Sequence, residues 1–297
     1  MSWKGKTRGG LLGYKIFVLV LNQLGLKAAY FLLRLVSTYF VFFVPKASQA
    51  IYRYYKSIHY YSTFKAIRAV FTNYYIFGQT LLDKIAIMSG AVTDFSYDFD
   101  GEEHLHQLKA GGKGGMLISA HLGNWDIAGY LLKRIDVNIN IVMFEAEHER
   151  IKNYLDNIVQ NNNVNIIPIK GDMSHIILIK KAINNNEIIC MHGDRFVKGS
   201  RVSKRKFMNN EAYFPTGVFS IAHKLKVPYT FVYCLKESPN SKHYKLSSTT
   251  IKNPSNSPLD ILDDYVKSLE EKLKQFPNQW FNYFDFWSDE AEGAIIE

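Results

Sequence analysis

From about residue 100 onward, short apolar runs alternate with segments whose apolar residues recur at helical spacing. The apolar runs predict strands over residues 116–120, 139–144, 164–169, 187–191 and 229–235. The periodic segments predict helices from Asn124 onward and over 101–110, 147–160, 174–184 and 215–225. Short buried strands separated by helices of this length form βαβ units. The pattern therefore predicts an α/β fold with a mixed, mostly parallel sheet flanked by helices.

The N-terminal part of the chain has a different pattern, a long apolar region over residues 11–44. Polar residues interrupt it at Lys15, Asn22–Gln23, Lys27 and Arg34, so no window of about 18 uncharged apolar residues marks a clear span. A spanning helix with a snorkelling Arg34, an amphipathic helix in the membrane interface and a helical pair packed on the soluble domain all fit. We expect residues 1–50 to be a membrane-anchoring or interfacial helical segment, with its flanking cations on the cytoplasmic side.

Two further features near the N-terminus bear on whether the chain is secreted and on what it binds. Ser48–Gln49–Ala50 imitates a signal-peptide cleavage site, but the long apolar stretch before it is unlike a signal-peptide n-region. Residues 51–88 have helical period and interleave tyrosines with cations, which suits either single-strand nucleic-acid stacking or a membrane surface. The membrane interpretation agrees with the apolar N-terminus, and no fold signal supports nucleic-acid binding.

Composition narrows the class of protein without choosing a partner. The chain has 297 residues, 47% hydrophobic, and a formal net charge of +9. This charge favours an anionic partner such as a phospholipid surface, an acidic carrier protein or nucleic acid. Cys190 and Cys234 lie in apolar runs and give neither a disulfide framework nor a zinc-ligand spacing.

Candidate chemistry lies where the strand at 116–120 meets the following helix. His121 is placed in the strand-to-helix turn and Asp126 in the first helical turn, five positions later. Across such a turn the acid can fold back toward the imidazole, fix its tautomer and leave the other ring nitrogen to act as a general base. The same two residues at the same spacing could also be a histidine at the end of a strand and an acid that caps a helix, with no catalytic role.

The residues around this pair add a family resemblance. His121-Leu122-Gly123-Asn124-Trp125-Asp126 resembles the H-x-G-N-W-(E/D) block of the lipid A biosynthesis acyltransferase family. Phe214–Gly217 and Phe276–Phe281 resemble a helix entry and a closing P-x-Q-W block of the same family, so the resemblance runs over about residues 65–287. It implies that residues 51–297 form an acyltransferase domain, with His121 as the base and Asp126 as its partner.

Other candidates follow neighbouring strands at the same sheet edge, where α/β proteins bind ligands. Asp194 and Arg195 leave the strand at 187–191, at a point where the family has an acidic motif. His192 could be a second base or a metal ligand, but no paired spacing supports a metal, and none is expected. We also expect substrate-binding roles for Gly123 and Asn124 in the turn, and for a basic loop that contains Arg201, Lys204 and Arg205.

The resemblance implies transfer of a fatty acyl chain from an acyl carrier protein or coenzyme A thioester, without a cofactor, to a lipid A precursor hydroxyl at the cytoplasmic face of the inner membrane. Backbone N–H groups of the Gly123 turn or Arg195 would stabilise the oxyanion. Glu145 stands where these enzymes carry an arginine, which keeps another acceptor open, such as an aminoacyl lipid or an aryl-polyene headgroup. A non-catalytic lipid-binding protein of the same fold is a third hypothesis. An apolar groove beside the His121 ring would favour catalysis.

Overall fold

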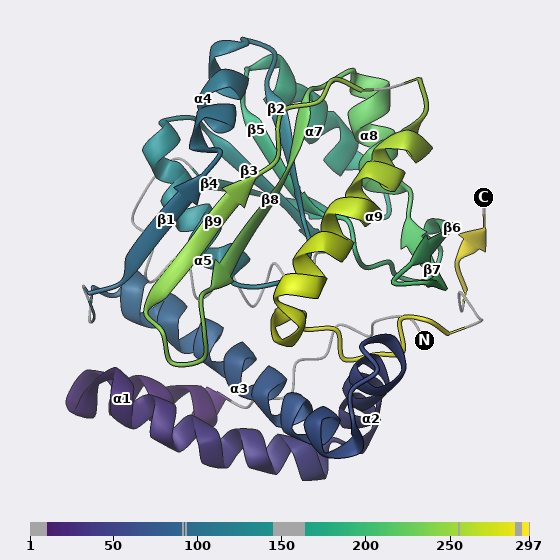
Figure 1. The fold of residues 1–297 in the computed structure, drawn as a ribbon. Coiled ribbons are helices and arrows are strands. Elements are labelled where there is room, and N and C mark those ends of the chain that lie inside the picture. The colour runs from purple at the N-terminus through teal and green to yellow at the C-terminus, as the bar shows by residue number, and fades with distance from the viewer. Residues whose placement is uncertain are drawn as a thin grey trace.

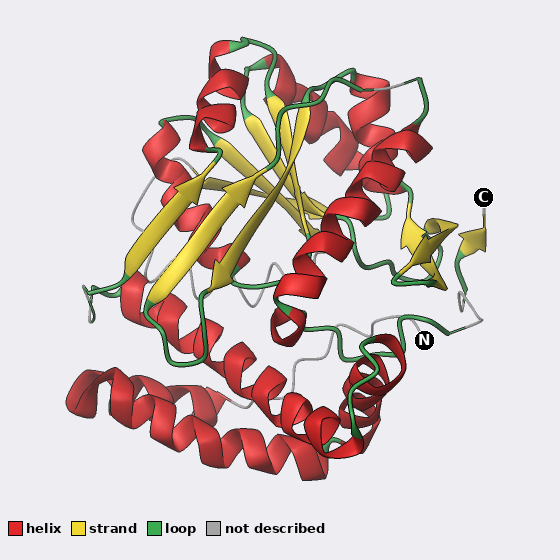
Figure 2. Ribbon diagram, in the orientation of Figure 1, coloured by secondary structure: helices red, strands yellow, loops and turns green. Residues whose placement is uncertain are grey.

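The computed structural model describes residues 11–90, 92, 94–144, 164–254, 256–288 and 293–296. The helix predicted over 147–160, and the region of Glu145 and Arg150, lie outside these residues. The described part is an α/β structure in which helices cover both faces of a twisted sheet, as Figure 2 shows. The predicted fold class is confirmed.

The main sheet has seven strands in the order β1-β9-β8-β2-β5-β3-β4 (Figure 1). All neighbouring pairs are parallel except β8 with β9. The five predicted strands appear as β2 (Gly115–Ser119), β3 (Ile139–Phe144), β4 (Val164–Ile169), β5 (Ile188–His192) and β8 (Tyr229–Lys236). Two further strands, β1 (Ser96–Asp100) and β9 (His243–Ser248), extend the sheet beyond the prediction.

Alternation along β2 assigns the two faces of the sheet. Met116 and Ile118 belong to the large core that includes residues of α7 (Ser174–Asn184), α8 (Gly217–Leu225) and α9 (Pro258–Gln275). Leu117 points the other way and packs with Leu108 of α4 (Glu102–Ala110). Because successive side chains of a strand face opposite sides, the unbroken apolar run of β2 is buried on both faces.

Helix boundaries follow local signals in the sequence. α5 (Trp125–Leu131) begins after Asn124, whose side chain accepts from the Ile127 N–H at 3.3 Å, and a 3-10 turn (Leu132–Ile135) follows it. The predicted helix over 215–225 begins two residues later, because Pro215 is the last residue of a strand. α9 begins after Ser257 with Pro258 in its first turn, and both residues are signals for the start of a helix.

The N-terminal apolar region folds into one long helix, α1 (Leu11–Phe43), with a break at Gly25, where φ is 78°. α2 (Pro45–Arg53), a π-helical turn (Tyr54–Ile58) and α3 (Thr63–Met88) follow. α1 lies along α3 at the base of the molecule (Figure 1). Among the described residues, Lys15–Phe43 is the one helix long and apolar enough to cross a bilayer, with a mean hydropathy of 1.8.

The expectation of a basic loop at 201–206 is wrong. These residues form β6 (Arg201–Phe207), which pairs antiparallel with β7 (Asn210–Pro215) and parallel with β10 (Ile295–Ile296). Val202, Ser203 and Phe207 are buried, while the exposed side chains between them include Arg201, Lys204 and Lys206. These exposed cations thus lie on a short sheet, which Figure 2 shows beside the C-terminus.

Candidate active site

Strand register brings His121 and Asp194 together. β2 and β5 are parallel neighbours, and Ser119 is paired with His192 across them. His121 and Asp194 each follow that pair by two residues, so both leave the carboxyl edge of the sheet at the same point. The His121 Nδ1 lies 2.8 Å from Asp194 Oδ1. The expectation that the two motifs meet at one sheet edge is confirmed by this contact.

Asp194 is held rigidly. Its side chain is 1% exposed, and its Oδ2 accepts from the His121 backbone N–H at 2.9 Å and from Trp280 Nε1 at 3.1 Å. Burial by itself would raise the pKa of this carboxyl, but the His121 ring, its hydrogen bond and the Arg195 guanidinium outweigh burial and lower it. Asp194 is therefore ionised, and it accepts a hydrogen bond from Nδ1–H of a neutral His121.

Asp126, the partner predicted for His121, makes a different contact. Its Oδ1 lies 2.8 Å from Lys84 Nζ on α3, and the side chains are 18% and 10% exposed. Among the residues that the structure describes, Asp194 is the carboxylate on the His121 ring. The structure thus pairs Asp126 with Lys84 and Asp194 with His121, because α5 directs Asp126 toward α3 while the end of β5 supplies a carboxylate opposite the ring. The catalytic partnership of His121 with Asp126 stays a prediction.

The His121 ring carries a second imidazole beside it. The His192 ring stands perpendicular to that of His121, with centroids 4.4 Å apart, and also contacts Trp125. Burial, with a further effect of His121, lowers the pKa of His192 to about 3, so this ring is neutral near pH 7. Burial also lowers the pKa of His121, Arg195 lowers it further, and Asp194 opposes both. His121 is therefore an unprotonated base at neutral pH.

A metal ion has a potential ligand set here. His121, His192 and Asp194 offer ligand atoms within 4.8 Å of one another. Both Asp194 oxygens, however, already accept hydrogen bonds from His121 and Trp280. A carboxylate that accepts from a histidine Nδ1–H is the arrangement that orients a general base, so we interpret the cluster in that way.

Gly123 and Asn124 have structural contacts in the turn. Gly123 has φ of 75°, its N–H donates to the Gln279 carbonyl at 2.9 Å, and a Cβ here would overlap the Cys234 carbonyl. The Asn124 N–H donates to the same Cys234 carbonyl at 2.7 Å. The Asn124 side chain is 2% exposed and donates to the Thr80 carbonyl and to Tyr244. These two N–H groups are therefore committed to the protein and do not form the predicted oxyanion hole.

The closing block of the sequence completes the site. Trp280 forms a bridge with Leu122 and donates to Asp194, and the Phe281 N–H donates to the His121 carbonyl at 2.9 Å. Arg195 donates from its guanidinium to the Phe281 carbonyl. The structure thus gives the Phe276–Phe281 segment, first noted only as a resemblance, a direct role in positioning the histidine and its carboxylate.

Two of the basic residues of β6, Lys204 and Arg205, lie in ion pairs. Lys204 pairs with Glu211 at 2.8 Å on the neighbouring strand, and Arg205 pairs with Asp263 on α9. Both pairs are at least partly exposed. Arg201 contributes its backbone carbonyl, which accepts from the Thr216 N–H at 3.0 Å. The structure therefore does not gather Arg201, Lys204 and Arg205 around His121.

One pocket lies against the α4–α5 side of the sheet, and it is largely apolar. Its walls include Leu105, Ala128, Leu132, Val232 and Leu246. His121 and Asp194 do not line it. The groove expected to end beside the His121 ring is therefore not this pocket.

The comparison with family models decides the assignment. The model for bacterial lipid A biosynthesis acyltransferases matches residues 60–287. The chain belongs to this family. The match contains every residue of the site, from Lys84 on α3 to Trp280 and Phe281 in the closing block. A search of curated proteins found no match.

Membership supports an enzyme that transfers acyl groups to lipid, and it fits the long apolar helix α1 as a candidate membrane anchor. Sequence reasoning found His121, Asp194 and Arg195 but missed Lys84 and the way Trp280 binds Asp194. The contact between His121 and Asp194 depends on the register of β2 and β5, and no local sequence pattern encodes that register. The Asn124-Trp125-Asp126 letters gave no signal that Asp126 meets a lysine forty residues upstream.

Proposed function

We propose that this protein is a membrane-bound acyltransferase that moves a fatty acyl chain from an acyl thioester to a hydroxyl of a lipid A precursor or a related membrane lipid. The observation that carries the proposal is the 2.8 Å contact between His121 Nδ1 and Asp194 at the carboxyl edge of the sheet. Membership of the lipid A acyltransferase family supports the type of reaction. Acyl carrier protein is the proposed donor, with coenzyme A thioester as the alternative.

The reaction needs one group that can take and return a proton. With Asp194 on Nδ1, the Nε2 atom of His121, which lies 3.4 Å from His192 Nδ1, is the nitrogen left to accept the proton of the acceptor hydroxyl. His121 removes the hydroxyl proton as the oxygen attacks the thioester carbonyl, and a new C–O bond forms. Asp194 stabilises the imidazolium, the C–S bond then breaks, and the imidazolium returns its proton to the departing thiolate.

Arg195 is the proposed stabiliser of the oxyanion. Its guanidinium acts electrostatically on both His121 and Asp194, so it lies close to the reacting centre. A fixed cation there favours the tetrahedral intermediate over the neutral thioester. Asp126 at the start of α5 and Lys84 of α3 form a partly exposed ion pair next to Trp125. We propose that this pair contacts substrate and does not move the proton.

The enzyme assay uses the purified full chain in mixed micelles, with acyl carrier protein and coenzyme A thioesters offered separately. Replacement of His121 by Ala should abolish transfer while thermal unfolding stays near that of the unmodified protein. Equal turnover in this variant would instead favour the non-catalytic lipid-binding hypothesis. Release of free thiol in step with acylated lipid distinguishes transfer from hydrolysis.

Acceptor identity needs a separate experiment in cells. Mass spectrometry of total lipid from a deletion strain should show a lipid A species that lacks one acyl chain, restored by the unmodified gene and not by the His121→Ala gene. An unchanged lipid A together with loss of another acylated lipid would transfer the same chemistry to a different acceptor.

A further inference from the structure

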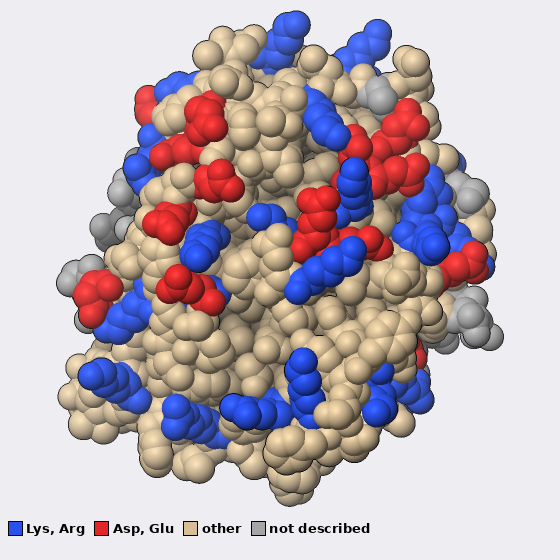
Figure 3. Space-filling view, in the orientation of Figure 1, with Lys and Arg blue, Asp and Glu red and all other residues tan. Residues whose placement is uncertain are grey.

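The positive charge of this protein comes entirely from its first quarter. Residues 1–82 contain eleven of the 36 Lys and Arg and none of the 27 Asp and Glu, which leaves 25 cations against 27 acids in the remainder. Figure 3 shows the result on the described residues, with Lys and Arg gathered along the lower edge over α1–α3 and the acids above it. Such separation favours an extended anionic partner at that edge.

The same edge exposes a continuous apolar stripe. Phe31, Leu35 and Phe42 of α1 are spaced by four and seven residues, so they share one face of the helix, and they are 60–72% exposed. Leu24, just before the break at Gly25, is 70% exposed. Lys27 and Arg34 are also seven residues apart and lie on one flank of this stripe. In α3, Phe64 and Ile67 of the first turns are exposed too, at 78% and 53%.

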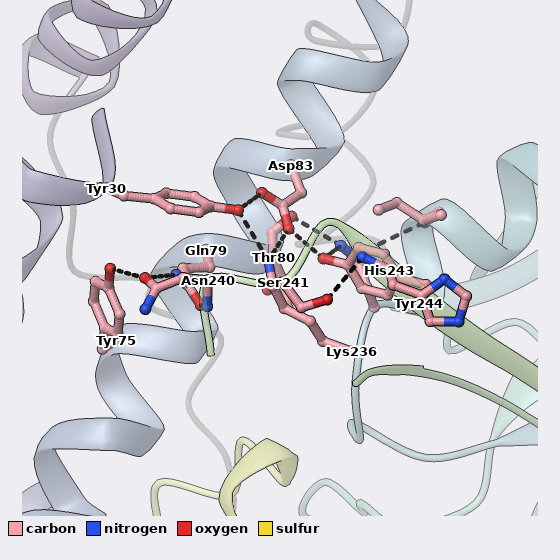
Figure 4. Close-up of polar contacts among 12 residues, drawn as sticks. Tyr30, Tyr75, Gln79, Thr80, Asp83, Lys236, Asn240, Ser241, His243 and Tyr244 are labelled. Carbon is pink, nitrogen blue, oxygen red and sulfur yellow. Dashed lines mark hydrogen bonds and ion pairs between the residues drawn. The ribbon is translucent and has the colours of Figure 1, made fainter. Parts of the chain in front are cut away.

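The opposite face of α1 is fixed to the protein. Leu26, Ala29 and Leu33 are buried against α3. The Tyr30 hydroxyl donates to Asp83 of α3 and accepts from Lys236 of β8 at 2.9 Å. The side chains of Asp83 and Lys236 are completely buried, and Figure 4 shows Tyr30 reaching into this cluster from α1.

The fixed face sets the orientation of α1. A spanning helix must present apolar surface to lipid on all sides that protein does not cover within the bilayer. Here one face of α1 packs along a helix that itself contributes buried charges to the soluble fold, so only the other face can meet lipid.

We propose that α1 and the start of α3 dock in plane on an anionic phospholipid bilayer, and that α1 does not cross it. Leu24, Phe31, Leu35 and Phe42 enter the acyl boundary, while Lys27 and Arg34 meet the headgroups. The docking proposal rests on the proposed function only for the role of docking, which is to bring the lipid acceptor to the carboxyl edge of the sheet, where His121 lies.

Contacts between α3 and the active site agree with that purpose. Asn124, three residues after His121, donates to the Thr80 carbonyl of α3 at 3.0 Å, and Asn73 of α3 donates to the Trp280 carbonyl at 2.9 Å. α3 therefore separates the docking face from the turn that holds His121 by the thickness of one helix (Figure 1). The proposed docking face therefore lies close to the turn that holds the base.

Binding is tested by flotation of the full chain with vesicles of phosphatidylcholine alone or with one-third phosphatidylglycerol. Leu35→Glu combined with Phe42→Glu should lower partition into both vesicles by at least about tenfold. The matched control is Ile177→Glu, since Ile177 of α7 is 73% exposed away from this face, and it should bind like the unmodified protein. Equal losses in both variants would overturn the docking face.

The charge contribution is measured in the same vesicles. Lys27→Gln and Arg34→Gln should each reduce partition about fivefold with phosphatidylglycerol, and little without it, with the difference vanishing at high salt. Loss that is independent of lipid charge would contradict a role for the cations.

In-plane and spanning geometries are separated by labelling with a membrane-impermeant maleimide in sealed inverted vesicles. Single cysteines replace Gly13 and Lys46, which flank Lys15–Phe43, in a chain whose Cys190 and Cys234 are serines. In-plane docking predicts that both are labelled from the same side. Labelling from opposite sides would show that α1 crosses and would overturn the proposal. Vesicle flotation and maleimide labelling do not require turnover, so failure of the enzyme assay would leave their results unaffected.

Discussion

At the scale of single residues, the main question is which carboxylate serves His121. Asp194 contacts the ring at 2.8 Å and is buried, whereas Asp126 pairs with Lys84 and is partly exposed. The family resemblance points to Asp126, and the contacts point to Asp194. The two assignments predict different kinetics, because only a carboxylate that acts on the ring can change the pH at which His121 becomes a base.

Asp194→Asn should lower kcat by roughly 10²–10⁴-fold, because the ring loses the group that fixes its tautomer. Asp194 also raises the pKa of His121, so its removal lowers that pKa further. Activity requires neutral His121 and falls as pH drops through this pKa. The acid limb of the kcat profile should therefore move to lower pH in Asp194→Asn, and initial rates from pH 5 to 8 measure it.

The matched variant is Asp126→Asn, which should keep the acid limb in place and change KM more than kcat, since it breaks the ion pair to Lys84. If Asp126→Asn moves the limb and Asp194→Asn does not, Asp126 is the partner of His121 during turnover. A purely structural role for Asp194 would lower activity without displacing the limb.

His192 gives a prediction about stability. Its pKa is lowered to about 3 by burial, so the folded protein holds it neutral while the unfolded chain protonates it near pH 6.5. Stability from this group is complete above pH 6.5 and is lost as pH falls toward 3. Between pH 7 and pH 5 the loss should be about 1–2 kcal/mol. In His192→Asn, denaturant unfolding should show a shallower fall over that range; an unchanged slope would contradict a buried neutral ring.

At the scale of elements, the turn between β2 and α5 depends on one glycine. Gly123 has φ of 75°, and a Cβ would overlap the Cys234 carbonyl of β8. Gly123→Ala must strain the backbone and separate the turn from β8, so we expect a loss of about 2–4 kcal/mol and loss of activity.

Gly129→Ala in α5 is the control for that variant. The nearest atom to a Cβ there is Ile141 Cδ1 at 3.8 Å, an ordinary contact, and alanine favours the helix. Thermal unfolding of the two variants separates the predictions, and equal destabilisation would show that the turn does not depend on Gly123.

The sequence predicted the elements that are buried on both faces and missed those that are half exposed. β2, β5 and β8 are apolar runs that differ clearly from the flanking sequence. Their ends, and the candidate site residues that follow those ends, could therefore be predicted. β6 exposes Arg201, Lys204 and Lys206 to solvent, and this density of cations resembles a loop. β1 and β9 likewise alternate polar and apolar side chains, and they become strands by pairing with each other.

Prediction of the site ended where long-range pairing begins. His121 was identifiable from its position after a strand, and Asp194 from its position after the third strand further along the chain. That they meet requires β5 to lie next to β2 with Ser119 opposite His192, although β3 and β4 separate them in the chain. Trp280 reaches Asp194 from a segment 86 residues away, through packing that only the whole fold determines.

At the scale of the whole molecule, one buried cluster joins the membrane-facing helix to the sheet. Lys236 of β8 pairs with Asp83 of α3, and hydroxyls of Tyr30 from α1 and Tyr244 from β9 donate to the same carboxylate (Figure 4). Asn124 donates to Tyr244 at 3.3 Å, so the cluster extends to the turn that holds His121. Four elements, α1, α3, β8 and β9, thus contact one buried charge pair.

Breaking this pair should cost far more than breaking a surface pair of the same residue types. Lys236→Met removes the cation and leaves Asp83 charged in a site with no solvent exposure, so we expect a loss of about 3–5 kcal/mol in the free energy of unfolding. Lys204→Met is the control, because Lys204 and Glu211 are 44% and 72% exposed, and such pairs contribute under about 1 kcal/mol. Equilibrium denaturation in detergent measures both.

Asp83→Asn combined with Lys236→Met should cost less than the two single changes together, since the double variant leaves no unpaired charge. Additive losses would mean that Asp83 and Lys236 stabilise the fold independently, and that α1 is held to the sheet by apolar packing alone.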